Sequence, residues 1–171
     1  PSYDDFITPL GKVPVDKGLC NKLIEKELVI ENDNVHTWEH SLEVQLPFLQ
    51  HCLTDFDILP ILVGQSEAQN LADILSFLLE QDDFLIIVSS DLSHFHPQST
   101  AVQMDEATIE KIINMDCDLQ PSQACGCHAL NGFLSLAQAK KWHIKLVNKA
   151  NSGKLNNIKN EVVGYASFVL Y

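Results

Sequence analysis

The feature that most constrains the fold is a series of short apolar runs that alternate with longer amphipathic segments. One such run, Phe84–Val88, ends directly before the polar Ser89-Ser90-Asp91, and another, Ile58–Val63, ends at Gly64. Similar runs lie at 144–148 and 162–170. Continuously apolar runs are typical of strands that are buried on both faces of a parallel sheet. We therefore predict an α/β layered domain with a mostly parallel sheet flanked by helices.

Capping residues and apolar periodicity predict the helices between these runs. Asp16 is expected to cap the first helix, and Ser66 with Gln69 forms a capping-box pattern for a later one. In the second helical segment, Pro47 predicts a kink or a restart. The predicted helices span 16–27, 40–53, 66–79, 104–115 and 126–140. We see no linker that would divide the chain, so residues 1–171 are expected to form a single domain.

The net charge of the chain limits its possible binding partners, and its cysteines indicate its cellular location. Asp and Glu number 23 against 11 Lys and Arg, which gives a net charge of −12. A surface this acidic repels phosphate groups, so neither nucleic acid nor an anionic membrane is an expected partner. No apolar run approaches the roughly 20 residues that span a bilayer. The five cysteines are scattered and odd in number, which indicates reduced thiols and a cytoplasmic location.

Asp91 and His94 follow the expected strand Phe84–Val88 at its C-terminal end. Open α/β sheets bind ligands at that edge. A histidine can transfer a proton near neutral pH, and a neighbouring carboxylate can orient its ring. The alternative is that Asp91 caps the next turn and that His94 is an ordinary loop histidine. For His96, which precedes Pro97, we expect an exposed loop residue.

Acids and a histidine also gather at Glu39, His40 and Glu43, at the start of the expected helix 40–53. Residues four apart on a helix share a face, so the two carboxylates could hold a metal beside the histidine. Acids in a first helical turn also stabilise the helix dipole without any other role. Both interpretations remain open.

Cys125 precedes the helix that is expected from Gly126. A thiol at a helix N-terminus has a lowered pKa, which makes it a better metal ligand or nucleophile. The alternative is a buried, inert cysteine, and we expect this for Cys20, Cys52 and Cys117. The Cys125-Gly126-Cys127-His128 sequence lacks the second pair of ligands that structural zinc sites use.

Three motifs, taken in order, resemble the Memo-like family. They are Glu39–Gln50, Ser89–His94 and Ala124–Gly126, and the segments 7–11, 150–153 and 163–166 fit the same family. The resemblance implies an α/β fold similar to that of the class III extradiol dioxygenases, which open aromatic rings with non-haem Fe(II). It implies that Cys125 is a metal ligand, that Asp91 and His94 are the acid and the acid/base histidine of the pocket, and that Glu39 and His40 belong to the pocket region.

The family's two metal-binding histidines lie in segments that would precede Pro1, and the chain has no counterpart to them. We therefore expect the N-terminal strands of the fold to be missing, and the opened sheet edge to favour homo-oligomers. The resemblance implies a metal-site protein that takes Fe(II) or copper, with catalysis by this chain alone doubtful. The alternative is a non-catalytic module that binds a small molecule or a peptide.

Overall fold

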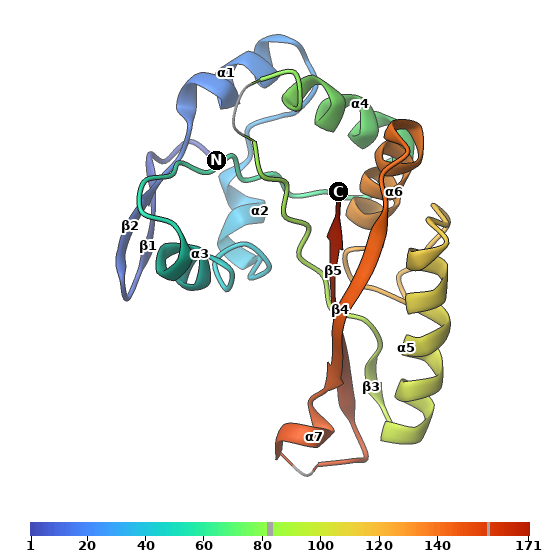
Figure 1. Ribbon diagram of the computed structural model, residues 1–171. Coiled ribbons are helices and arrows are strands. Elements are labelled where there is room, and N and C mark those ends of the chain that lie inside the picture. Colours follow the sequence, from blue (N-terminus) through green and yellow to red (C-terminus); the bar gives the residue numbers. More distant parts are fainter. Residues whose placement is uncertain (82–83, 157) are drawn as a thin grey trace. The chain divides into compact units, whose positions relative to one another are not determined.

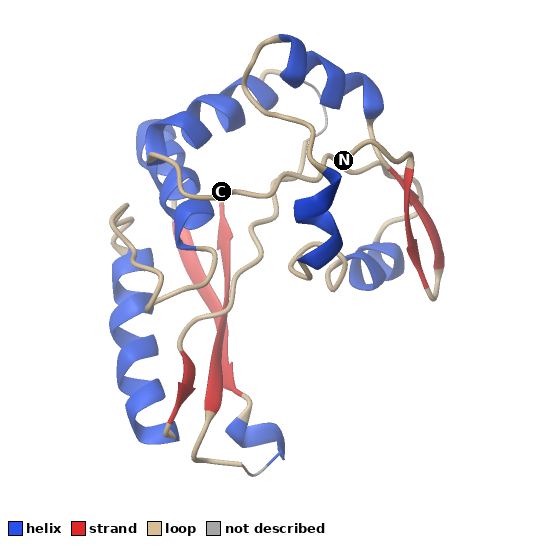
Figure 2. Ribbon diagram, turned by 180° about the vertical axis from the view of Figure 1, so that it is seen from behind, coloured by secondary structure: helices blue, strands red, loops and turns tan. Residues whose placement is uncertain are grey.

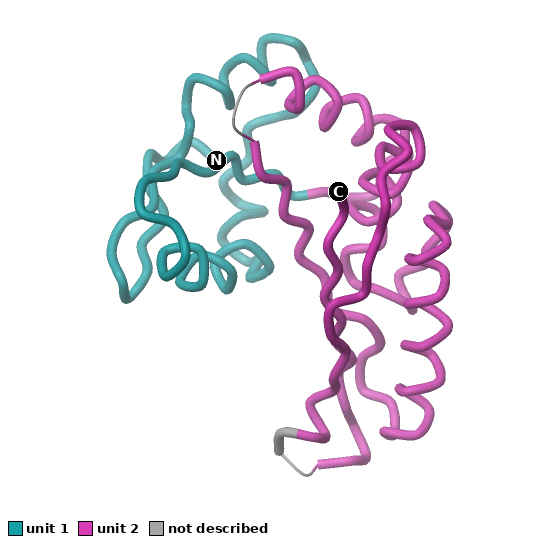
Figure 3. The backbone as a smooth tube through the Cα atoms, viewed as in Figure 1, with its two compact units in different colours: residues 1–62 teal, residues 63–171 magenta. Residues whose placement is uncertain are grey.

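The computed structural model describes residues 1–81, 84–156 and 158–171, and it shows a mixed α/β architecture (Figure 1). The backbone divides into two compact units, residues 1–62 and residues 63–171 (Figure 3). Within the described residues, no helix is long and apolar enough to cross a membrane.

The first unit begins with an antiparallel hairpin. Its strands are β1 (Asp5–Thr8) and β2 (Gly11–Pro14), and Gly11 has the positive φ of 122° that the tight connection requires. The helices are α1 (Lys17–Glu25), α2 (Asp33–Trp38) and α3 (Leu46–Cys52). The Asp16 carboxylate accepts a hydrogen bond from the Leu19 amide at 2.9 Å, which confirms the predicted cap of α1.

Two predictions for the first unit are wrong. The helix expected from His40 begins only at Leu46, because Pro47 lies in its first turn, where a missing N–H costs nothing, and residues 41–45 form turns. The strand expected at Ile58–Val63 is reduced to a single parallel bridge between Ile58 and Val15.

The second unit contains a three-stranded sheet in the order β3-β5-β4, and both of its pairings are antiparallel. The strands are β3 (His94–His96), β4 (Ile144–Asn151) and β5 (Val162–Leu170), and the short helix α7 (Gly153–Asn156) lies between β4 and β5. The predicted mostly parallel sheet is therefore wrong. Parallel neighbours need a crossover of a dozen or more residues, whereas the short connection after β4 lets β5 turn back beside it (Figure 2).

The run Phe84–Val88, predicted as a buried strand, is not part of a strand in the structure. Its burial alternates: Leu85 is 69% exposed and Ile87 is 46% exposed, while Phe84 and Ile86 are half-buried. An apolar run forms a doubly buried strand only where other layers cover both of its faces. Here Leu85 and Ile87 are exposed, so the run is less buried than its apolar composition predicted.

The main helices of the second unit are α4 (Ala68–Leu78), α5 (Gln98–Ile113) and α6 (Cys127–Lys140). Helix α4 packs against α6, and α5 runs along β4 and β5 (Figure 1). Helix α6 confirms the helix predicted at 126–140. Helix α5 starts earlier than expected because Pro97, which cannot donate to a strand ladder, ends β3 and leads directly into the helix.

The capping box predicted at Ser66 and Gln69 does not form. Glu67 is the N-cap residue of α4 and makes no side-chain capping bond. The Ser66 hydroxyl donates to the Glu67 carbonyl at 3.3 Å, and the Gln69 amide donates to Asp73 at 2.7 Å. Both side chains therefore have other hydrogen-bond partners that compete with the cap.

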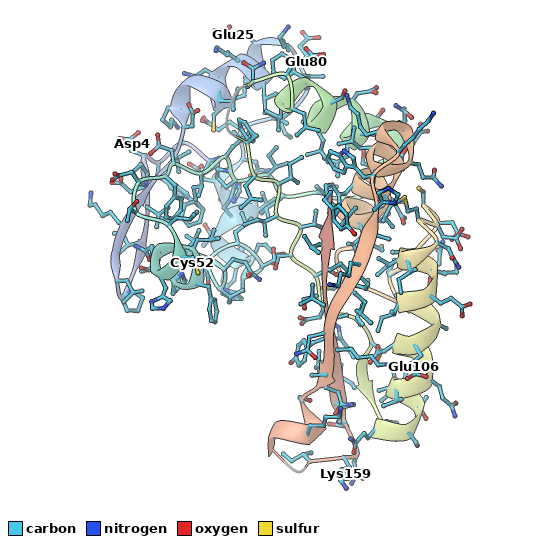
Figure 4. The ribbon with its side chains drawn as sticks, viewed as in Figure 1. Asp4, Glu25, Cys52, Glu80, Glu106 and Lys159 are labelled. Carbon is cyan, nitrogen blue, oxygen red and sulfur yellow. The ribbon has the colours of Figure 1, made fainter. Side chains whose placement is uncertain are left out.

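The core of the second unit lies between α5, α6 and the sheet. Its buried members are Leu92, Ile109, Ile112, Leu119, Ala124, Cys127 and Leu134. Ala166 and Phe168 of β5 pack against this cluster, so the even-numbered residues of β5 face the core. At the surface, Glu106 of α5, labelled in Figure 4, accepts a hydrogen bond from Lys149 of β4 at 2.7 Å.

Substitution of Gly164 tests the packing between β5 and α5. A Cβ at Gly164 would overlap the Asp105 carboxylate of α5. Because overpacking of a core costs about 1–3 kcal/mol, we expect Gly164→Ala to lower the free energy of unfolding by at least that amount in urea titrations. The control is Gly64→Ala, since nothing lies within 4 Å of a Cβ there. Equal stability of the two variants would contradict the close packing.

Candidate metal centre

Two segments far apart in the sequence meet at the candidate site. One is the extended segment that leads into β3 and carries Asp91 and His94. The other is the turn before α6, which carries Cys125. Both segments belong to the second unit, and both adjoin its core through Leu92 and Ala124.

Reciprocal hydrogen bonds fix the two segments to each other. The Asp91 amide donates to the Cys125 Sγ atom at 3.2 Å, and the Cys125 amide donates to the Asp91 carbonyl at 3.3 Å. The Gly126 amide donates to the Ser90 hydroxyl at 2.9 Å. A Cβ at Gly126 would lie 2.8 Å from the Ser90 Cβ, so glycine permits this close approach. The position of the thiol is thus set by the backbone.

Asp91, His94 and Cys125 form the candidate site. One potential ligand atom from each residue lies within 4.8 Å of the other two. The His94 Nε2 atom lies 3.3 Å from Asp91 Oδ2, and these side chains are 33% and 47% exposed. Cys125 is exposed as well. The three groups are therefore accessible from solvent.

The donor set fits a transition-metal ion. A carboxylate, an imidazole and a thiolate together suit Fe(II), copper or zinc better than Mg²⁺ or Ca²⁺, which prefer oxygen ligands. Ligand atoms bound to one tetrahedral ion lie roughly 3.5 Å from one another. The potential ligand atoms of the three residues lie within 4.8 Å of one another, so they would have to move closer together by only about 1 Å to bind one ion. Three protein ligands also leave room for a water molecule or a substrate at a fourth position.

Cys125 was predicted to lie directly before the helix, but the first helical residue of α6 is Cys127 and its N-cap is Gly126. Cys127 is buried, and burial raises the pKa of its thiol. Of this neighbouring pair, Cys125 is therefore the accessible thiol. Among the cysteines expected to be buried, Cys20 is buried, whereas Cys52 is exposed.

Glu39 and His40 lie in the first unit, between the end of α2 and the turns at 41–45, and the idea that Glu39 and Glu43 share a helical face is wrong. The Glu39 carboxylate accepts hydrogen bonds from the amides of Ser41 at 2.7 Å and His40 at 2.8 Å. The hydrogen bond from Ser41 is the main reason that the pKa of Glu39 is lowered. The His40 Nδ1 atom lies 2.6 Å from Glu43 Oε1. The structure thus gives Glu39 a local role in holding the turn.

His96, expected in an exposed loop, is half-buried in β3 instead, where it pairs with Val162. The short strand β3 forms because the first residues of β5, Val162 and Val163, pair with it. His94 pairs with Val163 in the same ladder, with a register shift between the two histidines. The backbone at His94 is therefore anchored to β5.

Tyr165 adjoins the site, and our sequence reasoning did not single it out. The Leu92 amide donates to the Gly164 carbonyl and the Gly164 amide donates to the Ser93 carbonyl, both at 2.9 Å. In an antiparallel arrangement this places Tyr165 across from Asp91. Burial raises the pKa of the Tyr165 phenol, and the Asp91 carboxylate raises it further. The alternation of side chains along β5, with Gly164 facing inward, is the signal that could have identified Tyr165.

Comparison with known proteins gives the family. A family model described as Memo-like protein matches residues 2–169. A MEMO1 family protein of Thermoplasma volcanium is 31% identical over 95% of this chain, and one of Archaeoglobus fulgidus is 32% identical over 98%. One of Saccharolobus islandicus is 34% identical over 94%. The chain belongs to the Memo-like family.

The chain spans only part of the length of these relatives. It covers 64% of the Thermoplasma protein, 68% of the Archaeoglobus protein and 62% of the Saccharolobus protein. The match therefore assigns the family to this chain, and it leaves about a third of each relative outside the comparison.

Titration of Tyr165 tests its place beside Asp91. Asp91→Asn removes the nearby negative charge, so we expect the pKa of the Tyr165 phenol to fall, yet to stay above its ordinary value because burial is the larger cause. Because the folded protein favours the neutral phenol, its contribution to stability is present at neutral pH and is lost as the pH rises through the raised pKa. Absorbance titration, with Tyr165→Phe to isolate the signal, measures the shift.

The matched control for this titration is Asp118→Asn. Asp118 is an exposed aspartate of the same unit that pairs with Lys111 at 2.8 Å. We expect its neutralisation to leave the Tyr165 titration unchanged. Equal shifts in the two aspartate variants would show that Tyr165 responds to the net charge and does not adjoin Asp91.

Proposed function

We propose that this chain provides a non-haem metal site in which Cys125 is the anchoring ligand and Asp91 and His94 complete the donor set. The observation that carries the proposal is the meeting of these three groups within 4.8 Å, on two segments joined by reciprocal hydrogen bonds. Membership of the Memo-like family supports the same residues. We propose Fe(II) or copper as the ion, because the imidazole and the carboxylate suit Fe(II) and the softer thiolate suits copper.

The pair of Asp91 and His94 gives the site a route for protons. The Asp91 Oδ2 atom, 3.3 Å from His94 Nε2, is placed to orient the imidazole ring and to stabilise its protonated form. A bound Fe(II) would supply the means to bind and activate oxygen, as in the class III extradiol dioxygenases. His94 would then accept or deliver a proton at its ring nitrogen. Tyr165, beside Asp91, offers a neutral phenol that can donate a hydrogen bond to a substrate oxygen.

We propose metal binding, and not catalysis, as the property of these 171 residues taken alone. The described residues bring together three donors, and catalytic metal sites of this kind usually have at least three firm protein ligands in addition to an acid/base group. If His94 and Asp91 serve as the proton pair, Cys125 alone remains as a firm ligand. The proposal assigns oxygen chemistry to the longer proteins of the family.

A second candidate function is a module that binds a small molecule or a peptide without catalysis. The exposure of all three side chains favours it, because an open surface site can accept a partner directly. Under either function we propose a reducing, cytoplasmic setting, in which the Cys125 thiol stays free. Association of two copies through an exposed strand edge also stays a prediction, and light scattering of the purified chain would measure it.

Anaerobic titration with Fe(II) and Cu(I) tests the proposal. We expect near-stoichiometric binding by the wild-type chain. For Cys125→Ala we expect a loss of affinity larger than the roughly 10- to 100-fold that removal of an outer-shell partner costs, because a ligand itself is lost. The matched control is Cys52→Ala, since Cys52 is also an exposed thiol but lies in the first unit. We expect that variant to bind as the wild type does.

The outcomes separate the two functions. Equal affinity in both cysteine variants, or no binding by the wild type, would contradict the metal site. We expect His94→Ala to weaken the affinity as well, because His94 belongs to the proposed donor set; an unchanged affinity would contradict its place among the ligands and leave it only the proton-transfer role beside Asp91.

A further inference from the structure

Asp105 is a buried carboxylate beneath the candidate site. It lies on α5 and is only 7% exposed. Its neighbours on the same helical face are Ala101, Thr108 and Ile109, which are also buried. Burial of a carboxylate costs several kcal/mol unless hydrogen bonds compensate for the loss of water. An aspartate that served only to fill space at this buried position would therefore destabilise the fold.

The Asp105 carboxylate holds the backbone between two residues of the site. Its Oδ1 atom accepts a hydrogen bond from the Ser93 amide at 3.0 Å. Ser93 lies between Asp91 and His94, and its own carbonyl accepts from the Gly164 amide at 2.9 Å. The segment is therefore held from two sides: α5 binds the Ser93 amide, and β5 binds the Ser93 carbonyl.

Gly164 completes this arrangement. The carboxylate occupies the space that a side chain at residue 164 would fill, so the helix approaches the strand at this level. The Ser93 side chain is 1% exposed, and its Oγ atom has no hydrogen-bond partner among the described residues. The backbone amide of Ser93, and not its hydroxyl, therefore carries the contact to Asp105.

We propose that Asp105 is a positioning residue of the site, which sets the relative placement of Asp91 and His94 by fixing the Ser93 amide between them. The inference rests on the proposed metal-binding function. Asp105 itself does not belong to the three donors, because its carboxylate is buried and bonded to the backbone. Its effect on the metal is transmitted through one backbone segment.

Two substitutions separate positioning from simple support of the fold. Asp105→Asn keeps an oxygen that can accept from the Ser93 amide, whereas Asp105→Leu keeps the branched arrangement of side-chain heavy atoms, with methyl groups larger than the oxygens, and removes the acceptor. The matched control is Thr108→Val, because Thr108 is 1% exposed on the same helix and its hydroxyl donates to the Met104 carbonyl within α5. That substitution also removes a buried hydrogen bond, but one that is remote from the Asp91–His94 segment.

The first readout is Co(II) binding by the full chain, followed through the thiolate-to-metal absorption band. We expect Asp105→Leu to lose at least tenfold in Co(II) affinity at a temperature where circular dichroism shows it folded. We expect Asp105→Asn to stay within about threefold of the wild type, and Thr108→Val to bind as the wild type does. Equal losses in Asp105→Leu and Thr108→Val would overturn the proposal, as would unchanged affinity in Asp105→Leu.

The second readout does not need a metal. Hydrogen exchange of the Ser93 amide, measured by NMR, should be fast in Asp105→Leu and slow in the wild type and in Asp105→Asn. If the wild type binds neither Co(II) nor the Fe(II) and Cu(I) of the earlier titration, the proposed function fails, and the Ser93 exchange still tests whether Asp105 fixes the segment. Protection of Ser93 that persists in Asp105→Leu would overturn the positioning role even if metal binding is confirmed.

Discussion

The close approach of β5 to α5 at Gly164 is the constraint on which the rest of the second unit depends. Because residue 164 has no side chain, the Asp105 carboxylate fits against the strand and can accept the Ser93 amide. The backbone of Gly164 binds Leu92 and Ser93 in turn, which fixes the segment that carries Asp91 and His94. A buried acceptor that lost its donor would cost about 1–3 kcal/mol, so these contacts support one another. The positions of Asp91 and His94 in the candidate site therefore depend on the contacts of Gly164, Asp105 and Ser93.

Elements with a strong local signal could be predicted from the sequence. Asp16 caps α1 as expected, the apolar periodicity after Gly126 identified α6, and the apolar run 162–170 matches β5. The motif containing Asp91 and His94 and the motif containing Cys125 were singled out separately, and the structure brings them together. Local patterns sufficed here because a cap, a helical face and an apolar run each depend on residues close in sequence.

The failures share a physical cause, which is dependence on partners distant in the sequence. Strand direction follows from which segments pair, and the antiparallel pairing of Ile144 with Leu170 cannot be read from either strand alone. The run Phe84–Val88 has the composition of a buried strand, but only tertiary cover would make it one. Tyr165 escaped notice because its relation to Asp91 exists only across the sheet. In the first unit, the restart predicted at Pro47 is confirmed by the start of α3, whereas the leucine spacing had extended the helix back to His40.

The central claim is that Cys125, with Asp91 and His94, binds one metal ion directly. X-ray absorption spectroscopy of the Fe(II)-loaded chain, prepared without oxygen, tests this claim most directly because it reports the atoms bound to the metal. The account predicts one sulfur at about 2.3 Å together with nitrogen and oxygen ligands at about 2.0–2.2 Å, and loss of the sulfur in Cys125→Ala. A coordination shell made only of nitrogen and oxygen in the wild-type chain would contradict it.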